Sequence, residues 1–197
     1  MKHKAVIFDL DGTILDNEHL YCQAFMAVIR NLGVKNLEKC PHTRGIGLKS
    51  NWAKILTEFN IQTHLSLADL DLATQAAYSK LIDEVTLRAG FEAFATDLKN
   101  RGVKLALATS NYRDVTNFVI QKFQLDRFFE VVVTANDVEK TKPDPETFLL
   151  TAQKLGVTPA DCLVYEDAEA GLAAARAAGM EVIHVTDDYV FNSSAKR

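Results

Sequence analysis

The sequence alternates short, β-rich apolar runs with helical segments, and no other feature restricts the possible folds as strongly. The apolar runs span residues 4–8, 103–108, 131–133, 163–165 and 182–185. Helical periodicity separates the later runs, and Gly102, Gly156 and Gly179 are placed to end three of these helices. Strands that alternate with helices predict a parallel sheet with helices on both faces. We therefore expect an α/β fold with a Rossmann-like, doubly wound parallel sheet.

One long segment interrupts this alternation, because its apolar positions follow only the spacing of helices. A first helix is expected over residues 17–32, and Gly33 ends it. A second apolar stripe runs from Trp52 to Phe59, and nothing in residues 34–88 predicts a strand. The segment therefore predicts a small helical domain inserted after the first strand.

The chain thus divides into two predicted domains, an α/β core of residues 1–16 and 89–197 and a helical insertion of residues 17–88. Within the insertion, three aromatic side chains are expected to pack the helices together rather than to bind a ligand: Phe25, Trp52 and Phe59.

The composition is that of an ordinary globular protein, since 48% of the 197 residues are hydrophobic. The net charge is -4, whereas proteins that bind nucleic acids usually present a basic face. No apolar run reaches transmembrane length, and the first apolar stretch is too short for a signal peptide. We therefore expect a cytoplasmic monomer that binds neither nucleic acid nor membranes.

The three cysteines, Cys22, Cys40 and Cys162, form an odd set without CxxC or metal-site spacing. Such a set predicts no disulfide framework and fits a reducing cytosol. Cys162 begins the apolar run CLVY and is expected to be a small core residue.

Polar side chains stand where three of the predicted strands end. They come in pairs: Asp9 and Asp11, Thr109 and Ser110, and Glu166 and Asp167. Ligands of open parallel sheets bind beyond the carboxyl ends of the strands, so these side chains should converge on one crevice. Each acidic residue alone is more often a turn or helix-cap residue, but their joint placement favours a site. Carboxylates held together need a cation, and hard oxygen ligands with a phosphate co-ligand suit Mg2+.

Lys142 extends this prediction. It precedes a predicted helix, and the prolines that follow it, Pro143 and Pro145, stiffen its loop. Its ammonium group is therefore expected over the crevice, where it would balance the carboxylates and a phosphate. The alternative is a solvated surface lysine, which is the expectation for Lys140.

These residues resemble, in order and spacing, the four motifs of the haloacid dehalogenase (HAD) superfamily, over essentially the whole chain. The matching positions are Asp9-Leu10-Asp11-Gly12-Thr13, Thr109-Ser110, Lys142-Pro143 and Glu166-Asp167. The insertion after the first motif resembles the helical cap domain of this superfamily. Residues 142–179 are most similar to the branch of β-phosphoglucomutases and sugar-phosphate phosphatases such as bacterial fructose-1-phosphatase.

The resemblance implies that Asp9 is a nucleophile that forms an aspartyl-phosphate. Asp11 would protonate the leaving oxygen and then deprotonate the attacking water. Mg2+ would be bound through Asp9, the backbone carbonyl of Asp11 and Asp167, and Glu166 would either ligate it or orient the ligands. A dehalogenase needs no proton donor at position 11, so the second aspartate favours phosphoryl chemistry.

The phosphoryl oxygens would be bound by the Thr109 hydroxyl and by the backbone N–H groups of Ser110 and Asn111, with Lys142 adding positive charge. Weaker assignments fall on the first loop. There Thr13 would donate a hydrogen bond, and Asp16 would shape the hinge into the cap or begin its first helix.

The implied reaction is hydrolysis of a small phosphorylated metabolite, most simply a sugar phosphate. The alternative is a phosphosugar mutase of the β-phosphoglucomutase type. Leu48 stands where those mutases carry an arginine, which weakens this alternative, although Arg44 and Lys49 could substitute. Tyr112-Arg113 also replaces the Lys-Asn that follows their second motif. A HAD fold kept as a non-catalytic binding module predicts loss of part of the motif set, and every motif is present.

Substrate selection is expected from the cap. Its candidates are Arg44, Lys49 and Asn51, for which the alternative is a set of solvent-facing residues beside a glycine-rich turn. His42 and His64 lie in polar segments without partner spacing and are expected to be ordinary surface histidines.

Overall fold

The computed structural model describes residues 2–35, 37 and 39–192 of the chain. Five parallel strands form its sheet in the order β5-β4-β1-β6-β7. Their bounds are Ala5–Phe8 (β1), Lys104–Ala108 (β4), Val131–Val133 (β5), Cys162–Glu166 (β6) and Glu181–His184 (β7). The predicted parallel α/β sheet is therefore confirmed, with β1 at its centre.

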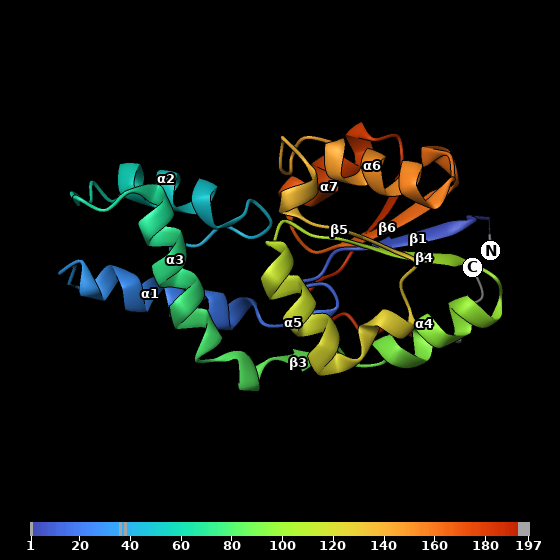
Figure 1. The fold of residues 1–197 in the computed structure, drawn as a ribbon, viewed down its shortest axis with the longest axis horizontal. Coiled ribbons are helices and arrows are strands. Elements are labelled where there is room, and N and C mark those ends of the chain that lie inside the picture. Colours follow the sequence, from blue (N-terminus) through green and yellow to red (C-terminus); the bar gives the residue numbers. More distant parts are fainter. Residues whose placement is uncertain (1, 36, 38, 193–197) are drawn as a thin grey trace.

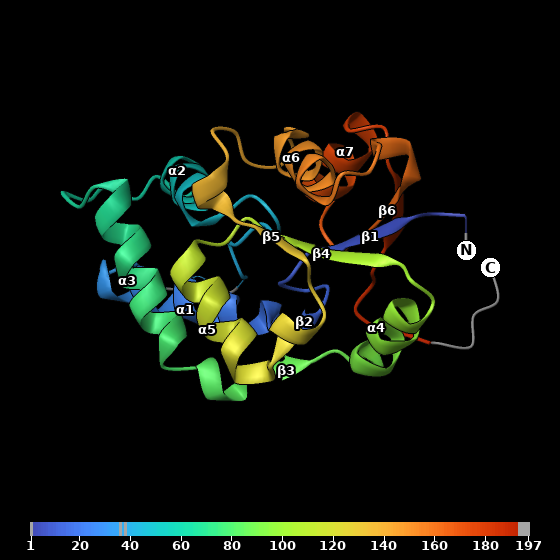
Figure 2. The same ribbon diagram turned by 45° about the vertical axis from the view of Figure 1, so that its right-hand side comes forward.

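Four helices cover the sheet in two layers (Figures 1 and 2). On one face lie α4 (Phe91–Asn100) and α5 (Arg113–Phe123), and on the other lie α6 (Glu146–Leu155) and α7 (Glu169–Ala177). Four short 3-10 helices complete these connections and the end of the insertion: Ile82–Glu84, Leu125–Arg127, Ala135–Asp137 and Pro159–Asp161.

The side chains of β1 alternate between these two layers and tie them to the sheet. Val6 and Phe8 join the cluster that includes Phe91 of α4, while Ala5 and Ile7 join the cluster around Phe148 of α6. All four residues of β1 are fully buried, which explains why this strand is continuously apolar rather than alternating. Burying one phenylalanine of this kind contributes about 1.5–3 kcal/mol, so the sheet provides a rigid support for the loops at its edge.

Three further helices form the insertion: α1 (Glu18–Asn31), α2 (Leu48–Glu58) and α3 (Leu67–Ser79). They lie beyond the carboxyl ends of the sheet strands and pack around a separate apolar cluster (Figure 1). Phe25 and Trp52 are fully buried there, and the indole N–H of Trp52 donates to the Thr74 hydroxyl at 2.8 Å. Phe59 is 36% exposed, so the expectation that it packs the helices together was wrong.

The expectation of no strand within residues 34–88 was also wrong. β3 (Thr86–Leu87) pairs antiparallel with β2 (Leu15–Asp16), where the chain leaves and re-enters the core. Two residues are too few to show the alternation by which a strand is recognised. The neighbouring Arg88 is buried, and its guanidinium donates to the backbone carbonyls of Thr13 and Gly12.

Within the part of the chain that the structure describes, no helix has the length and apolar character needed to cross a membrane.

Candidate active site

Lys142 occupies the centre of a buried ionic cluster at the carboxyl end of β1. Its ammonium donates to Asp9 Oδ1 at 2.5 Å, to Glu166 Oε2 at 2.8 Å and to the Ala108 carbonyl at 3.2 Å. The side chain of Lys142 is 0% exposed, whereas that of Lys140 is 72% exposed. The structure therefore buries Lys142 beside Asp9 and Glu166, and the surface-lysine alternative was wrong for it.

The charges of this cluster are mutually dependent. Burial alone would lower the pKa of Lys142, but the Asp9 and Glu166 carboxylates outweigh burial and raise it. Burial, followed by repulsion from Glu166, raises the pKa of Asp9 well above its usual range, and Lys142 opposes that rise. The lysine is therefore a permanent cation, but one ammonium does not compensate all of the carboxylates around it.

Three buried carboxylates lie close together in this cluster. One oxygen from each of Asp9, Glu166 and Asp167 lies within 4.8 Å of the other two. Glu166 is already engaged, because Oε2 accepts from Lys142 and Oε1 accepts from the Ala168 N–H at 3.0 Å.

Asp167 is less satisfied. Its Oδ1 accepts a hydrogen bond from Thr13 at 3.3 Å, but its buried Oδ2 accepts none. Burial and then Glu166 raise the pKa of Asp167 to about 7. A buried carboxylate oxygen without a donor, beside two other carboxylates, fits an oxygen-ligated divalent cation such as Mg2+.

Position 12, beside this cluster, requires glycine because there is no space for a side chain. A Cβ at this position would lie 2.2 Å from Asp167 Oδ2, and the backbone has a φ of +73°. Any side chain at position 12 would therefore displace Asp167.

Asp11 lies outside the group of three carboxylates and is held by amides instead. Its Oδ1 accepts from Asn17 Nδ2 at 2.6 Å, and its Oδ2 accepts from Asn111 Nδ2 at 2.5 Å. Burial raises the pKa of Asp11 to about 6, and the two amides oppose that rise. Sequence reasoning missed Asn17, because an asparagine before a helix reads as a cap. Here its side chain makes no cap hydrogen bond and turns to Asp11.

The loop after β4 brings the predicted phosphate-binding residues to the same crevice. Thr109 is 1% exposed, and its Oγ1 accepts from the Asn111 N–H at 3.1 Å. The Ser110 hydroxyl donates to the Gly45 carbonyl of the insertion at 3.0 Å. These contacts fix the loop and link it to the insertion.

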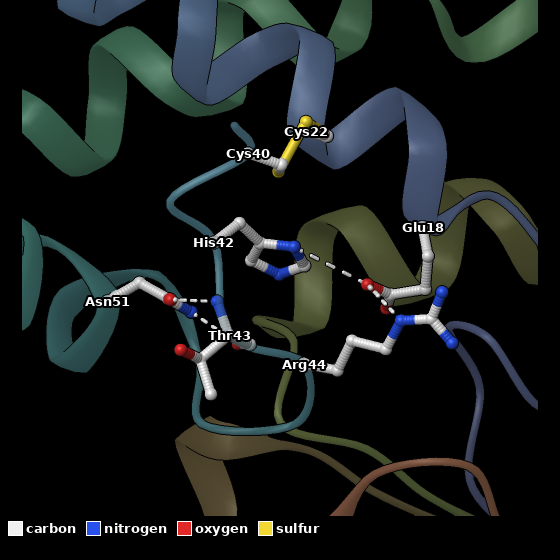
Figure 3. The surroundings of a disulfide bond; sticks show 7 residues. All are labelled: Glu18, Cys22, Cys40, His42, Thr43, Arg44 and Asn51. Carbon is white, nitrogen blue, oxygen red and sulfur yellow. Dashed lines mark hydrogen bonds and ion pairs between the residues drawn. A yellow bond between two sulfur atoms is a disulfide. The ribbon is translucent and has the colours of Figure 1, made fainter. Parts of the chain in front are cut away.

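The three candidates from the insertion lie in different environments. Arg44 is ion-paired with Asp187 at 2.8 Å and also lies 3.7 Å from Asp167 Oδ2, so it reaches the edge of the ionic cluster. Lys49 is exposed on α2. Asn51 is buried and holds the loop before α2. Its side-chain oxygen accepts from the Thr43 N–H, and its side-chain nitrogen donates to the Thr43 carbonyl (Figure 3).

His42 is not a surface histidine, which corrects the sequence-based expectation. Its side chain is 9% exposed and stacks on Phe25 at 5.2 Å between ring centroids. Its Nδ1 lies 3.5 Å from Glu18 Oε2 (Figure 3). Burial lowers the pKa of His42 to about 4, so its imidazole is neutral near pH 7. Burial raises the pKa of Glu18, whose Oε2 also lies 3.7 Å from Arg44 Nε. His64 is exposed, as expected.

Cys22 of α1 and Cys40 form a disulfide with 5.6 Å between their Cα atoms (Figure 3). The prediction of no disulfide was therefore wrong. Spacing could not reveal it, because the two cysteines are 18 residues apart and meet only when the loop folds back on α1. Cys162 is a free, buried thiol, as expected.

The crevice between the sheet and the insertion contains a cavity of about 40 Å³. The core contributes Asp9, Asp11, Thr109, Ser110 and Asn111 to its wall, and the insertion contributes Glu18, Tyr21, His42, Gly45, Gly47, Leu48 and Asn51. Small-molecule sites usually enclose about 300–1,000 Å³, so this cavity is narrower than most of them.

Comparison with known proteins identifies this arrangement. Residues 6–185 match the family model described as haloacid dehalogenase-like hydrolase. The chain is 34% identical to fructose-1-phosphate phosphatase YqaB of Escherichia coli, over 93% of this chain and 97% of that protein. It is 32% identical to β-phosphoglucomutase of Bacillus subtilis, over 92% of this chain and 83% of that protein.

Among solved structures, β-phosphoglucomutase from Clostridium difficile superposes with a TM-score of 0.82 at 27% identity. The match covers 92% of this chain and 84% of that one. The family model spans nearly the whole chain and includes the strand ends that carry Asp9 and Asp167 and the loop that carries Lys142. The chain therefore belongs to the haloacid dehalogenase-like hydrolase family.

Proposed function

We propose that the protein is a Mg2+-dependent phosphatase that hydrolyses a small phosphorylated metabolite, such as a sugar phosphate, through an aspartyl-phosphate. The observation that carries this proposal is the position of Asp9. Its carboxylate is buried at the end of β1, paired with Lys142 and close to the Asp167 oxygen that accepts no hydrogen bond. A nucleophilic carboxylate needs this cationic surrounding, because it must approach an anionic phosphate.

In the proposed reaction, an oxygen of Asp9 attacks the phosphorus while the bond from phosphorus to the leaving oxygen breaks. Asp11 gives its proton to that oxygen and becomes a carboxylate. It then takes a proton from water, which attacks the phosphorus, releases inorganic phosphate and restores Asp9. A pKa of about 6 suits this double role, since both forms of Asp11 are accessible near neutral pH.

The other core residues would bind charge. Lys142 keeps its positive charge beside Asp9 throughout, and the Thr109 hydroxyl with the Ser110 backbone N–H would bind phosphoryl oxygens. Asp9, Asp167 and the Asp11 carbonyl would hold Mg2+, with Glu166 orienting Lys142 and the ligands. When bound, the ion would neutralise the phosphoryl oxygens and so lower the electrostatic barrier to attack.

Hydrolysis is favoured over phosphosugar mutation by the wall of the cavity. None of the described residues that line it is a lysine or an arginine. A mutase must clamp a second phosphate there, and Leu48 instead packs against the apolar clusters of core and insertion. A phosphatase acting on phosphorylated carbohydrates is also consistent with the relative that acts on fructose 1-phosphate.

Residues 17–88 would act as a cap that opens to admit substrate. Polar contacts that join the cap to the core include the hydrogen bonds from Ser110 to Gly45, from Tyr112 to Asp71 and from Tyr21 to Asn111, and the ion pair of Arg44 with Asp187. Each is a single contact that opening could break, while the β2–β3 pair would remain as the hinge.

The test measures phosphate release from fructose 1-phosphate, glucose 6-phosphate, β-glucose 1-phosphate and nucleoside monophosphates, with Mg2+ and with EDTA. The proposal predicts Mg2+-dependent release that is lost in Asp9→Asn. Absence of release from every compound, together with conversion of β-glucose 1-phosphate to glucose 6-phosphate, would replace the phosphatase by the mutase.

A further inference from the structure

The two tyrosines behind Asp11 belong to a closed set of contacts around its carboxylate. Asn17 Nδ2, which donates to Asp11 Oδ1, also donates to the Tyr78 hydroxyl at 2.7 Å. On the other side, the amide of Asn111 donates to Asp11 Oδ2 and accepts from the Tyr21 hydroxyl at 3.1 Å. Each oxygen of Asp11 is therefore held by an amide, and each amide is held by a tyrosine.

The two tyrosines support each other. Their rings stack with centroids 4.1 Å apart and an angle of 11° between the planes. Tyr78 is 3% exposed and Tyr21 is 5% exposed, and burial raises the pKa of each hydroxyl above its usual value. Both hydroxyls therefore remain protonated and neutral, and neither has freedom to move away from its amide.

The amide group of Asn17 uses its oxygen and both of its hydrogens in hydrogen bonds. Its Oδ1 accepts from the Gly12 N–H at 3.1 Å, and Nδ2 donates to Asp11 and Tyr78. An amide has two donor hydrogens, so both of them are used. Without the Tyr78 hydroxyl, one buried donor would be left unsatisfied, and rotation of the amide to satisfy it would release Asp11.

From these contacts we propose that Tyr78, acting through Asn17, is a positioning residue that orients the Asp11 carboxyl for proton transfer to the leaving oxygen. Tyr78 lies near the end of α3, and Asn17 precedes α1, so Asp11 is oriented by the helical insertion. The inference rests on the proposed phosphatase reaction, in which Asp11 is the proton donor. The Tyr78 hydroxyl bonds Asn17 and none of the carboxylates of Asp9, Glu166 and Asp167 among the described contacts, so its effect on the site passes through Asn17.

The leaving group separates this role from a structural one. A sugar alkoxide must be protonated as it departs, whereas para-nitrophenolate is stable as an anion and departs without a proton. The ratio kcat/KM covers only the steps up to departure of the leaving group, so the later hydrolysis of the aspartyl-phosphate does not enter. If the Asp11 carboxyl is no longer oriented for proton transfer, kcat/KM should therefore fall for a sugar phosphate and stay unchanged for para-nitrophenyl phosphate.

The experiment compares kcat/KM of wild type and Tyr78→Phe for para-nitrophenyl phosphate and for the panel's best sugar phosphate. Phenylalanine keeps the ring stack and removes only the hydroxyl. We expect a loss of about tenfold for the sugar phosphate, within the range that misplacement of a catalytic group produces, and less than twofold for the aryl phosphate. Tyr112→Phe is the matched control, because it removes a cap-to-core hydrogen bond to Asp71 that does not reach Asp11.

A double-mutant cycle with Asn17→Ala tests the route of the effect. Because Tyr78 acts through Asn17, adding Tyr78→Phe to Asn17→Ala should cause no further loss. Equal losses for both substrates in Tyr78→Phe, no loss for either, or full additivity in the cycle would overturn the inference. Failure of the proposed function would look different, since wild type would then release phosphate from neither substrate.

Discussion

At the scale of single residues, Lys142 contributes both to stability and to the proposed chemistry. Its side chain is fully buried and is the cation that faces Asp9 and Glu166 directly. Removing one partner of a buried ion pair leaves uncompensated charge, which is more costly than losing an exposed pair.

We predict that Lys142→Met lowers the free energy of unfolding by about 3 kcal/mol in EDTA at neutral pH. Mg2+ should restore part of this loss, because a cation would again compensate the carboxylates. Urea denaturation with and without Mg2+ measures both effects. Lys140→Met, at an exposed position, should change stability by less than about 0.5 kcal/mol. Equal stability of Lys142→Met and wild type would contradict the account.

The buried His42 predicts a pH dependence of stability. Its pKa falls from 6.5 to about 4 in the folded state, a difference of about 3 kcal/mol. The unfolded chain therefore binds the additional proton between these pH values. The stabilisation is complete above pH 6.5 and is lost as the pH falls toward 4.

His42→Phe keeps the stack on Phe25 and should remove this dependence, so the gap in stability between wild type and variant should shift by about 3 kcal/mol between pH 7 and pH 4. Denaturation at a series of pH values measures it, with the exposed His64→Phe as control. A constant gap would show that His42 is not buried in neutral form.

Sequence patterns at the residue scale predicted the residues that stand at strand ends, because a strand end fixes its position relative to the other strands. Asp9, Asp11, Thr109 and Asp167 are in this group, and Lys142 joined it through its motif spacing. Asn17 and Tyr78 could not be found in this way. Asn17 matters because it bonds Asp11, and Tyr78 because it bonds Asn17. Local sequence patterns do not predict such contacts between distant parts of the chain.

At the scale of elements, the five sheet strands were predicted to within a few residues, because buried parallel strands are continuously apolar. The β2–β3 pair was missed because two-residue strands carry no periodicity. The loop before α2 was also misjudged. Its shape depends on the Cys22–Cys40 disulfide, on the stacking of His42 and on the amide of Asn51, none of which follows from spacing.

The disulfide should stabilise this loop measurably. A cross-link between residues 18 apart restricts the unfolded chain by about 3 kcal/mol in the chain-entropy model. We therefore predict that dithiothreitol lowers the Tm of wild type by several degrees, while Cys22→Ser/Cys40→Ser starts from the lower Tm and does not respond. A wild-type Tm that is unaffected by reductant would mean that the bond does not form in solution.

At the scale of the whole molecule, the narrow cavity supports the proposal that the insertion takes two positions relative to the sheet. The cavity of about 40 Å³ has no room for a sugar phosphate, so the closed arrangement must open for substrate to enter. Apolar contacts also join the two sides, because Leu20, Tyr21 and Tyr78 of the insertion belong to the same cluster as Phe8 and Phe91 of the core. We therefore expect the insertion to pivot on these contacts rather than to separate from the core.

Spin labels at the exposed positions Leu72 of α3 and Phe118 of α5 can follow this motion. We predict a broad distribution of label distances in the free protein, with a component longer than the closed distance. Addition of Mg2+ and beryllium fluoride, a phosphoryl mimic, should narrow it to the shorter component. One identical distance under both conditions would exclude opening on this hinge.

The central claim is that Asp9 becomes covalently phosphorylated, and rapid acid quenching followed by peptide mass spectrometry tests it most directly. During turnover of para-nitrophenyl phosphate with Mg2+, the peptide that contains Asp9 should gain one phosphoryl group, and the same peptide of Asp9→Asn should not. Phosphate release that continues in Asp9→Asn, or a fully active wild type whose Asp9 peptide never carries phosphate, would contradict the account.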